Sequence, residues 1–87
     1  MTTAMEQETT VAPEEGLHAR PAARFVHTAK HYDSEIVVVK DGQEANAKSA
    51  LRLMTLAAHK GDRIVIRAEG EDAEEAVSAL VEMISEV

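Results

Sequence analysis

Gly16-Leu17-His18-Ala19-Arg20-Pro21-Ala22-Ala23 is the stretch that sets the start of the first helix and places a histidine at that start. Gly16 ends the preceding segment with a turn residue. Pro21 is confined to the first helical turn, since a proline further along would break the backbone hydrogen-bond ladder. His18 therefore stands at the point where the helix begins.

His18 is predicted to accept a phosphoryl group and to hold it briefly. Backbone N–H groups in the first turn of a helix have no acceptor within the helix, and the helix dipole adds partial positive charge there. Arg20 adds a guanidinium, so the histidine adjoins a site suited to an anion. Histidine is also nucleophilic near neutral pH. The alternative is a histidine that only caps the helix beside a surface arginine. We disfavour this alternative because Gly16, Arg20 and Pro21 occur together with His18 at the spacing of a turn followed by a helix start.

The length and composition exclude several classes of protein. The 87 residues make one domain, with residues 1–4 expected to be a disordered N-terminus and residues 5–87 folded. There is no cysteine, which excludes disulfides and thiolate metal sites and fits a reducing compartment. No apolar run approaches the roughly 20 residues of a membrane span, and the N-terminus lacks the pattern of a signal peptide. We therefore expect a cytoplasmic protein.

The charges are unevenly distributed along the chain. Residues 1–15 carry four acids and no lysine or arginine, and residues 69–87 carry seven acids and no base. Residues 16–68 hold all nine lysines and arginines against five acids, a net of +4. The formal total of −7 argues against nucleic-acid binding. The basic middle segment instead predicts docking onto an acidic partner, with charge mainly assisting the rate and orientation of encounter.

Three segments are predicted to be helical. Ser49 is predicted to cap a second helix that runs towards His59 and is ended by Gly61. The segment from Asp72 to Glu75 has the pattern of a capping box and opens the third helix. The first helix, residues 19–31, gathers four apolar residues on one face: Ala22, Phe25, Val26 and Ala29. The third helix does the same with Ala76, Val77, Leu80, Val81 and Ile84.

Four segments are predicted to be strands. Alternation around Thr9 and Val11 is a weak strand signal, whereas residues 36–39 are a β-branched run. Asp41 and Gly42 give a strong hairpin signal, with a brief strand over residues 44–47 closing the hairpin. Residues 63–67 are predicted as another strand, whose outer charges, Arg63 and Arg67, alternate with Ile64 and Ile66. The order is therefore β-α-β-β-α-β-α, an α+β fold in which helices cover one face of a small antiparallel sheet.

The sequence resembles HPr, the histidine-containing phosphocarrier family of the bacterial phosphoenolpyruvate:sugar phosphotransferase system. Besides residues 16–23, the resemblance includes three further motifs and the final helix. It covers residues 5–87 and implies an open-faced β-sandwich, in which a four-stranded antiparallel sheet is covered on one face by three helices. The further motifs are Ala47-Lys48-Ser49 with the apolar helix after it, Lys60-Gly61-Asp62, and Ala68-Glu69-Gly70-Glu71-Asp72.

The resemblance also implies roles for the residues around His18. In the family, enzyme I phosphorylates the matching histidine at Nδ1, using phosphoenolpyruvate, and the histidine passes the group to a sugar-specific enzyme IIA. Carried over, His18 is the phosphoacceptor and Arg20 stabilises the phosphate. The backbone N–H groups of Ala19 and Arg20 are expected to face it as well. The protein is then a relay without a cofactor rather than an autonomous enzyme, since the chain has no Walker-type loop.

Ser49 has two expected roles. As an N-cap it stabilises its helix by about 1 kcal/mol. In some bacterial members of the family, an ATP-dependent HPr kinase/phosphorylase modifies the matching serine. A phosphate there is favourable at a helix N-terminus but adds about −2 charge to a surface that receives an acidic partner.

The second helix carries more apolar residues than one buried stripe can hold. We expect Leu53, Leu56 and Ala57 to face the sheet. Leu51 and Met54 are then left outward, and a small apolar patch beside a basic rim is typical of a transient protein interface. The resemblance implies that this helix and the start of the first one form one docking face for enzyme I and enzyme IIA. The rim of this docking face is Arg24, His27, Lys48 and Arg52.

Two further groups of residues bear on the site. His27 and His31 have a spacing that can bind a metal, but no carboxylate or cysteine at ligand spacing supports it, so no metal site is predicted. Glu14 and Glu15 precede Gly16, where the family commonly has a short polar residue. Carboxylates at these positions oppose a phosphate unless they point to solvent.

Two alternatives to this interpretation stay open. One is an HPr-like paralogue that serves a nitrogen-related or regulatory phosphorelay branch and still uses His18. The other, of a different class, is an interaction domain that is not phosphorylated and in which His18 only caps a helix. We expect a monomer, since the sequence offers no large apolar face, and we expect neither nucleic-acid binding nor membrane insertion.

Overall fold

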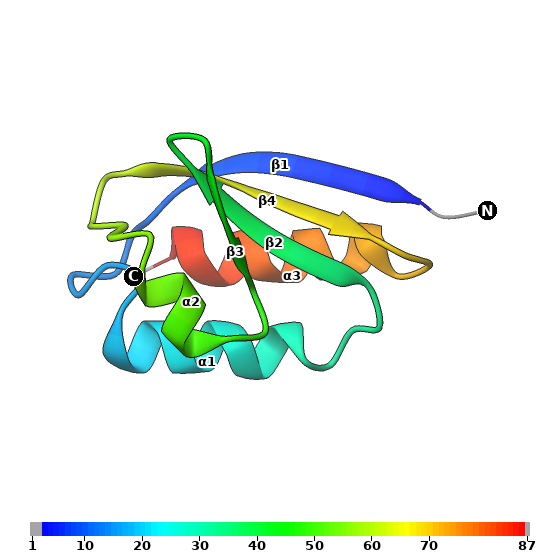
Figure 1. The fold of residues 1–87 in the computed structure, drawn as a ribbon, viewed down its shortest axis with the longest axis horizontal. Helices are drawn as coiled ribbons and strands as arrows, with labels where there is room; N and C mark the ends of the chain where they lie inside the picture. The colour runs from blue at the N-terminus through cyan, green and yellow to red at the C-terminus, as the bar shows by residue number, and fades with distance from the viewer. Residues whose placement is uncertain (1–2, 87) are drawn as a thin grey trace.

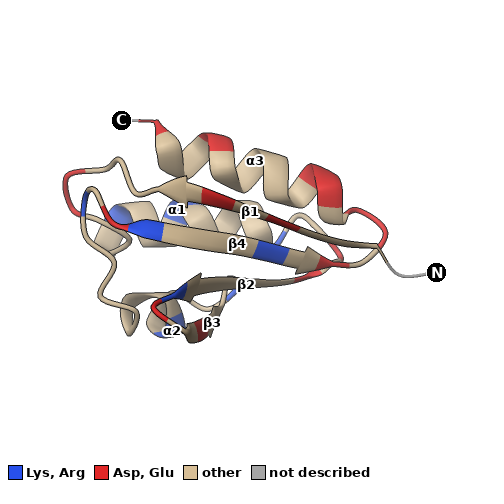
Figure 2. Ribbon diagram, turned by 90° about the horizontal axis from the view of Figure 1, so that it is seen from above, with Lys and Arg blue, Asp and Glu red and all other residues tan. Residues whose placement is uncertain are grey.

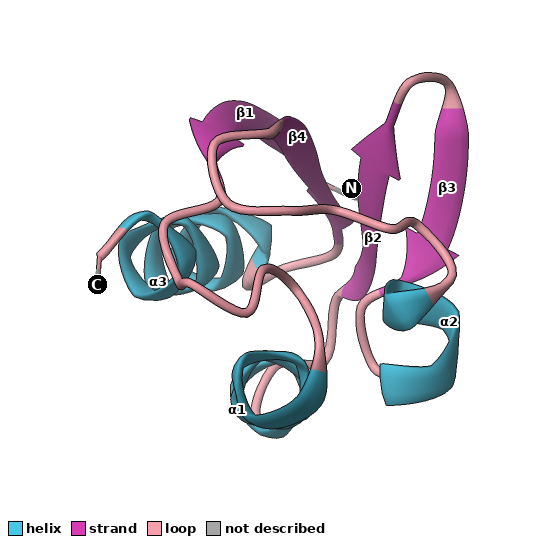
Figure 3. Ribbon diagram, turned by 90° about the vertical axis from the view of Figure 1, so that its left-hand side faces the viewer, coloured by secondary structure: helices cyan, strands magenta, loops and turns pink. Residues whose placement is uncertain are grey.

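The computed structural model describes residues 3–86 and has the predicted order of elements. All strand pairs are antiparallel, in the order β1-β4-β2-β3. Figures 1 and 3 show the helices on one face of this sheet, so the predicted open-faced architecture is confirmed. The strands are β1 (Ala4–Thr10), β2 (Glu35–Lys40), β3 (Gln43–Asn46) and β4 (Arg63–Glu69), and the helices are α1 (Ala19–Ala29), α2 (Ala50–Met54) and α3 (Ala73–Ser85).

Alternation along the strands determines which face of the sheet the helices cover. Val38 of β2 lies opposite Ile66 of β4, and both are fully buried. Their neighbours Val37 and Arg67 lie opposite each other on the outer face and are only half-buried. Because successive side chains point to opposite faces, a shift of one residue in register would expose the whole apolar set.

The helices α1 and α3 bury the faces that their periodicity predicted. Side chains such as Phe25 of α1 and Leu80 of α3 are fully buried, and each contributes about 2 kcal/mol through burial. Val81 is half-buried and packs against the same core. The buried residues of the two helices are Ala22, Phe25, Val26 and Ala29 in α1, and Ala73, Ala76, Val77, Leu80 and Ile84 in α3.

Helix α2 is shorter than the sequence predicted. The expected helix ran towards His59, whereas α2 ends at Met54. Beyond it, the N–H groups of Leu56 and Ala57 bond to carbonyls three residues back, which is a tighter turn than that of an α-helix. Ala57 then adopts a φ of 52°, in the left-handed region, and this ends the helical path.

The early end of α2 changes which alanine faces the core. Ala57, predicted to face the sheet, is exposed, and Ala58 is buried instead. The cap at the other end is confirmed, because the Ser49 hydroxyl accepts a hydrogen bond from the Arg52 N–H at 3.3 Å. The other two residues predicted to face the sheet, Leu53 and Leu56, are buried.

Strand β1 begins earlier than the sequence indicated. Its signal centred on Thr9 and Val11, but β1 spans Ala4–Thr10, and Val11 lies fully buried past its end. Ala4 pairs with Glu69 of β4, so it is ordered although it fell in the segment predicted to be disordered. The length of this edge strand is set by its long partner β4 rather than by its own weak propensity. Residues 1 and 2 of the predicted disordered segment lie outside the described residues.

The capping box predicted at the start of α3 does not form. Asp72 is at the N-cap position, but its carboxylate makes no capping hydrogen bond. It accepts instead from the N–H groups of Asp33 at 2.8 Å and Ser34 at 3.0 Å, and from the Ser34 hydroxyl. The Ser34 hydroxyl, followed by the Asp33 N–H, holds the pKa of the Asp72 carboxyl below its ordinary value. The carboxylate thus joins the loop before β2 to the start of α3.

Asp72→Asn is expected to destabilise the protein at neutral pH but not in strong acid. Because the pKa of the carboxyl is lower in the folded state, its contribution is present above the unfolded-state pKa and is lost as pH falls through the folded-state value. Urea unfolding should show a lower midpoint for the variant at pH 7, and the two midpoints should converge as the pH falls through the folded-state pKa of Asp72. Glu71→Gln, an exposed neighbour, should keep the wild-type midpoint at both pH values. A wild-type midpoint for Asp72→Asn at pH 7 would contradict this role.

Candidate functional site

His18 is the N-cap residue of α1, and its side chain makes no capping hydrogen bond. Its backbone is extended, with φ −147° and ψ 161°, and its carbonyl accepts the first helical hydrogen bond from the Ala22 N–H at 3.3 Å. The imidazole makes no capping hydrogen bond and the residue is exposed. His18 is thus the N-cap residue of α1 by its backbone, while its ring does not cap the helix.

The first turn of α1 offers donors beside His18. Within residues 3–86 the N–H groups of Ala19 and Arg20 have no acceptor, and Pro21 has no N–H to donate. The Arg20 guanidinium makes no ion pair with any side chain in that range, and the first turn contains no acid. Unpaired N–H groups and a guanidinium at a helix N-terminus are suited to bind an anion such as phosphate.

The backbone turns sharply directly after His18. Ala19 has a φ of 49°, in the left-handed region, although it is not glycine. Such a conformation costs an L-residue roughly 1–2 kcal/mol and persists only when the surrounding packing fixes it. Leu17 on the other side of His18 is 1% exposed and anchors the chain in the core. The histidine is thus presented from a fixed backbone rather than from a mobile loop.

The loop before His18 is held against the segment that follows α2. The Leu17 N–H donates to the Ala58 carbonyl at 2.9 Å. Gly16 has a φ of 73°, and a Cβ added to it would lie 2.4 Å from the Ala58 oxygen. Both the backbone angle and the close approach therefore require glycine at this position.

The two carboxylates that precede Gly16 are exposed. The Glu14 Oε1 accepts a hydrogen bond from the Lys60 Nζ at 2.8 Å, a pair separated by 46 positions in the sequence. This hydrogen bond and the charge of Lys60 lower the pKa of Glu14. Glu14, Glu15 and Arg20 line one hollow of about 670 Å³ between this loop, α1 and the end of α3. Sequence reasoning missed Lys60, because nothing in the local pattern joins the two loops.

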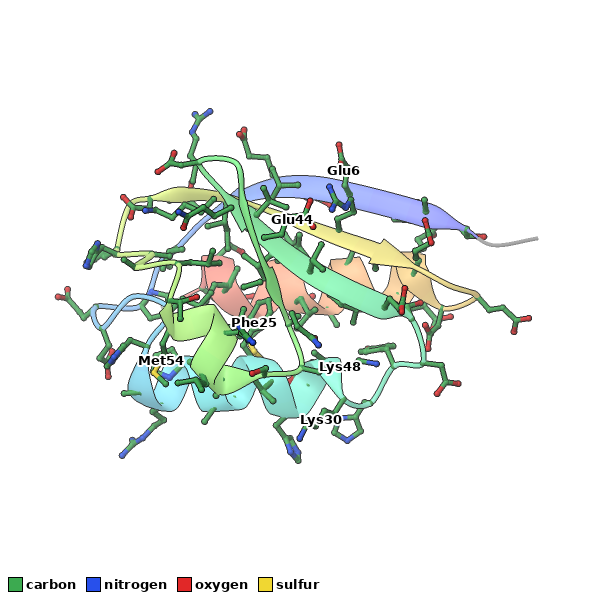
Figure 4. All side chains as sticks on the ribbon, viewed as in Figure 1. Glu6, Phe25, Lys30, Glu44, Lys48 and Met54 are labelled. Atoms are coloured by element: carbon green, nitrogen blue, oxygen red, sulfur yellow. The ribbon has the colours of Figure 1, made fainter. Side chains whose placement is uncertain are left out.

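The apolar centre predicted for the docking face is partly exposed. Leu51 is 71% exposed, whereas Met54 is half-buried, and Figure 4 shows its side chain between α2 and α1. Figure 2 shows basic segments on α1 and acidic ones on α3 and β1, so the charge asymmetry along the sequence is also an asymmetry in space. Three of the predicted rim residues are exposed: Arg24, His27 and Arg52.

Lys48 differs from the other predicted rim residues. It is half-buried, and its Nζ donates to the Tyr32 carbonyl at 2.7 Å, just past the end of α1. Figure 4 shows the Lys48 side chain directed towards this end of the helix. An ammonium there offsets the negative end of the helix dipole. Its charge is thus already engaged within the molecule.

A histidine in the last turn of α1, His27, contacts His31, which lies just past the end of the helix. The rings of His27 and His31 meet edge to face with centroids 4.9 Å apart, and the His31 Nδ1 lies 2.9 Å from the His27 carbonyl oxygen. Residues 3–86 contain no cluster of three side chains able to hold a metal ion. Within the same range, no helix has the length and apolar character needed to cross a bilayer.

Comparison with known families identifies the fold and the class of protein. A family model described as the PTS HPr component phosphorylation site matches residues 5–86. The chain belongs to the HPr family. The predicted resemblance is therefore confirmed, and with it membership of the phosphocarrier class of the phosphotransferase system.

Individual HPr proteins match over nearly the whole chain. The phosphocarrier protein HPr of Vibrio cholerae is 44% identical over 82 residues, covering 94% of this chain and 96% of that protein. The HPr-like protein Crh of Halalkalibacterium halodurans is 44% identical over 80 residues, covering 92% and 95%. The crystal structure of HPr from Bacillus anthracis superimposes with a TM-score of 0.90 at 42% identity, covering 93% of this chain and 96% of that one.

Proposed function

We propose that this HPr-family protein is a cytoplasmic phosphocarrier. It accepts a phosphoryl group on His18 from enzyme I, which draws the group from phosphoenolpyruvate, and it donates the group to a sugar-specific enzyme IIA. The observation that carries the proposal is that His18 is exposed and that its imidazole makes no capping hydrogen bond to α1. The residue adjoins the unpaired N–H groups of Ala19 and Arg20, and the guanidinium of Arg20, two positions on, makes no ion pair within residues 3–86.

The chemistry follows from this arrangement. The Nδ1 lone pair of His18 attacks phosphorus, and the bond from phosphorus to enzyme I breaks as the Nδ1–P bond forms, with its electron pair remaining on enzyme I. Negative charge on the phosphoryl oxygens is stabilised by the backbone donors and by Arg20. In donation, a nucleophile of enzyme IIA attacks phosphorus, and the Nδ1–P bond breaks with its electron pair returning to the imidazole.

Incubation with enzyme I and phosphoenolpyruvate tests the proposal. The intact mass should rise by one phosphoryl group, the group should be labile in acid, and it should leave when enzyme IIA is added. An unchanged mass would overturn the proposal. The identity of the enzyme IIA that accepts the group separates a sugar branch from a nitrogen-related or regulatory one, which is the paralogue alternative.

Arg20→Ala is expected to slow phosphorylation by about tenfold or more, because the guanidinium stabilises charge that builds up during transfer. Arg20 is exposed in a first helical turn, so the free energy of unfolding should change by no more than about 0.5 kcal/mol. Stopped-flow phosphorylation and urea unfolding measure the two effects. Arg63→Ala, on the outer face of the sheet, should leave the rate unchanged. A wild-type rate for Arg20→Ala with both enzyme I and enzyme IIA would exclude the role.

Two substitutions at the docking face should weaken enzyme I binding by different routes. Ser49→Asp keeps an N-cap but adds negative charge near Arg52, so association should slow and salt should mask the effect. Leu51→Ala removes apolar contact, so dissociation should accelerate on the order of fivefold with little salt dependence. Binding kinetics at two ionic strengths measure both. Wild-type binding by Ser49→Asp at low salt would show that this face is not the docking site.

Ser49 is also the residue that we propose as the target of HPr kinase/phosphorylase.

A further inference from the structure

The loop that precedes His18 is bonded along its backbone to the loop between α2 and β4. The Leu17 N–H donates to the Ala58 carbonyl at 2.9 Å, and the Val11 N–H donates to the Asp62 carbonyl at 2.9 Å. The Gly61 N–H returns a bond to the Val11 carbonyl at 2.8 Å. These bonds fix the two loops relative to each other, so an ion pair between their side chains is held in one place.

Glu14 and Lys60 form such an ion pair. Their Oε1 and Nζ atoms lie 2.8 Å apart, and the side chains are 77% and 51% exposed. Glu14 is inside a tight turn, closed by the Gly16 N–H on the Pro13 carbonyl at 2.9 Å, and is four positions before His18. The pKa of Glu14 is lowered by Lys60, so the carboxylate is charged at neutral pH.

Glu14 also shares a hollow with Arg20, the residue predicted to stabilise the phosphate. Arg20 and Arg24 line this hollow together with four carboxylates, those of Glu14, Glu15, Glu82 and Glu86. Of the four, only Glu14 has an ion-pair partner within residues 3–86. A carboxylate that pairs with Arg20 removes the charge that a phosphoryl group on His18 needs.

We propose that Lys60 is a positioning residue for phosphotransfer, which holds the Glu14 carboxylate so that it neither pairs with Arg20 nor opposes the phosphate on His18. Lys60 acts through Glu14 rather than on the phosphate directly. The inference rests on the proposed function of His18.

The test uses phosphoramidate, a small donor that phosphorylates imidazole without a protein partner. The phosphoryl group moves to the His18 nitrogen as the P–N bond of the donor breaks and ammonia leaves. Because His27, His31 and His59 are exposed imidazoles as well, the rate at His18 is the intact-mass increase of each variant less that of His18→Ala under the same conditions. Lys60→Gln should react about threefold more slowly at low salt, the scale of an exposed ion-pair interaction, and the difference should shrink as salt rises. Lys60→Arg should keep the wild-type rate.

Double variants separate a role through Glu14 from a direct effect of the Lys60 charge. Glu14→Gln combined with Lys60→Gln should react at the rate of Glu14→Gln alone. Glu15→Gln is the matched control, a neighbouring carboxylate of the same hollow, and in its background Lys60→Gln should still slow the reaction about threefold. Arg67→Gln breaks an ion pair of similar length, 2.7 Å to Glu44, on the outer face of the sheet, and should leave the rate unchanged.

Each outcome decides between named possibilities. Equal slowing by Lys60→Gln with and without Glu14 would overturn the proposal, because Lys60 would then act by its own charge. A wild-type rate for Lys60→Gln would overturn it as well. If the wild-type protein accepts no phosphate on His18 from enzyme I or from phosphoramidate, the proposed function itself fails. Unchanged urea midpoints of all variants exclude unfolding as the cause.

Discussion

His18→Ala is expected to take up no phosphate from enzyme I and phosphoenolpyruvate, whereas the wild-type protein takes up one group. The substitution removes the imidazole at the N-cap of α1, next to the unpaired N–H groups of Ala19 and Arg20. Because His18 is exposed and its imidazole makes no capping bond, unfolding free energy should change by no more than about 0.5 kcal/mol. Loss of phosphorylation would then be a loss of chemistry rather than of folding.

The matched control is His31→Ala, which removes an exposed histidine near the other end of the same helix. It should be phosphorylated to the wild-type extent. Intact mass under non-acidic conditions measures the phosphate, and treatment with acid should remove it from the wild-type protein and from His31→Ala alike. A full equivalent of phosphate on His18→Ala would assign the acceptor to another residue and overturn the site.

Gly16→Ala is expected to be the most destabilising single substitution near the site, by about 3 kcal/mol or more. Two independent costs combine. The backbone φ of 73° is unfavourable for alanine, and its Cβ would lie 2.4 Å from the Ala58 oxygen, a backbone atom that moves only if a loop moves. Displacing that loop also disturbs the Leu17 bond to Ala58, which fixes the segment before His18. Urea unfolding should therefore show a lower midpoint, and the phosphorylation rate should fall as well.

Gly61→Ala separates the two costs. Gly61 has a φ of 93°, but a Cβ added there meets nothing within 4 Å. Its substitution should carry only the conformational penalty, roughly 1 kcal/mol. The difference between the two variants measures the close packing of the two loops. Equal destabilisation of Gly16→Ala and Gly61→Ala would mean that the contact with Ala58 contributes nothing.

The fold was predictable because its signals repeat along the chain. The period of apolar residues in residues 19–29 and 73–85 gave the buried faces of α1 and α3, and the alternation around Ile64 and Ile66 gave the inner face of β4. The start of α1 was predictable for a different reason. Pro21 restricts helical geometry locally, so the position of His18 at the N-cap needs no information from distant residues.

Element ends and polar partners were predicted less well. Helix α2 stops at Met54 although apolar residues continue to Ala58. The chain must turn there so that the Ala58 carbonyl can accept a hydrogen bond from the Leu17 N–H. Asp72 has the sequence of a helix cap, yet its carboxylate serves a loop 38 and 39 positions away. A local sequence pattern shows which hydrogen-bonding groups a residue has. It does not show which donor from elsewhere in the chain will bond to them.

The order of elements, the buried faces and the histidine at the start of α1 follow from the sequence alone, since each depends on interactions within a few residues. The packing of the folded chain was needed to show that Lys48 bonds Tyr32, that Asp72 bonds Ser34 and that Lys60 holds Glu14. These pairs are separated by 16, 38 and 46 positions. Their formation depends on where the packed core places each loop, which no local periodicity encodes.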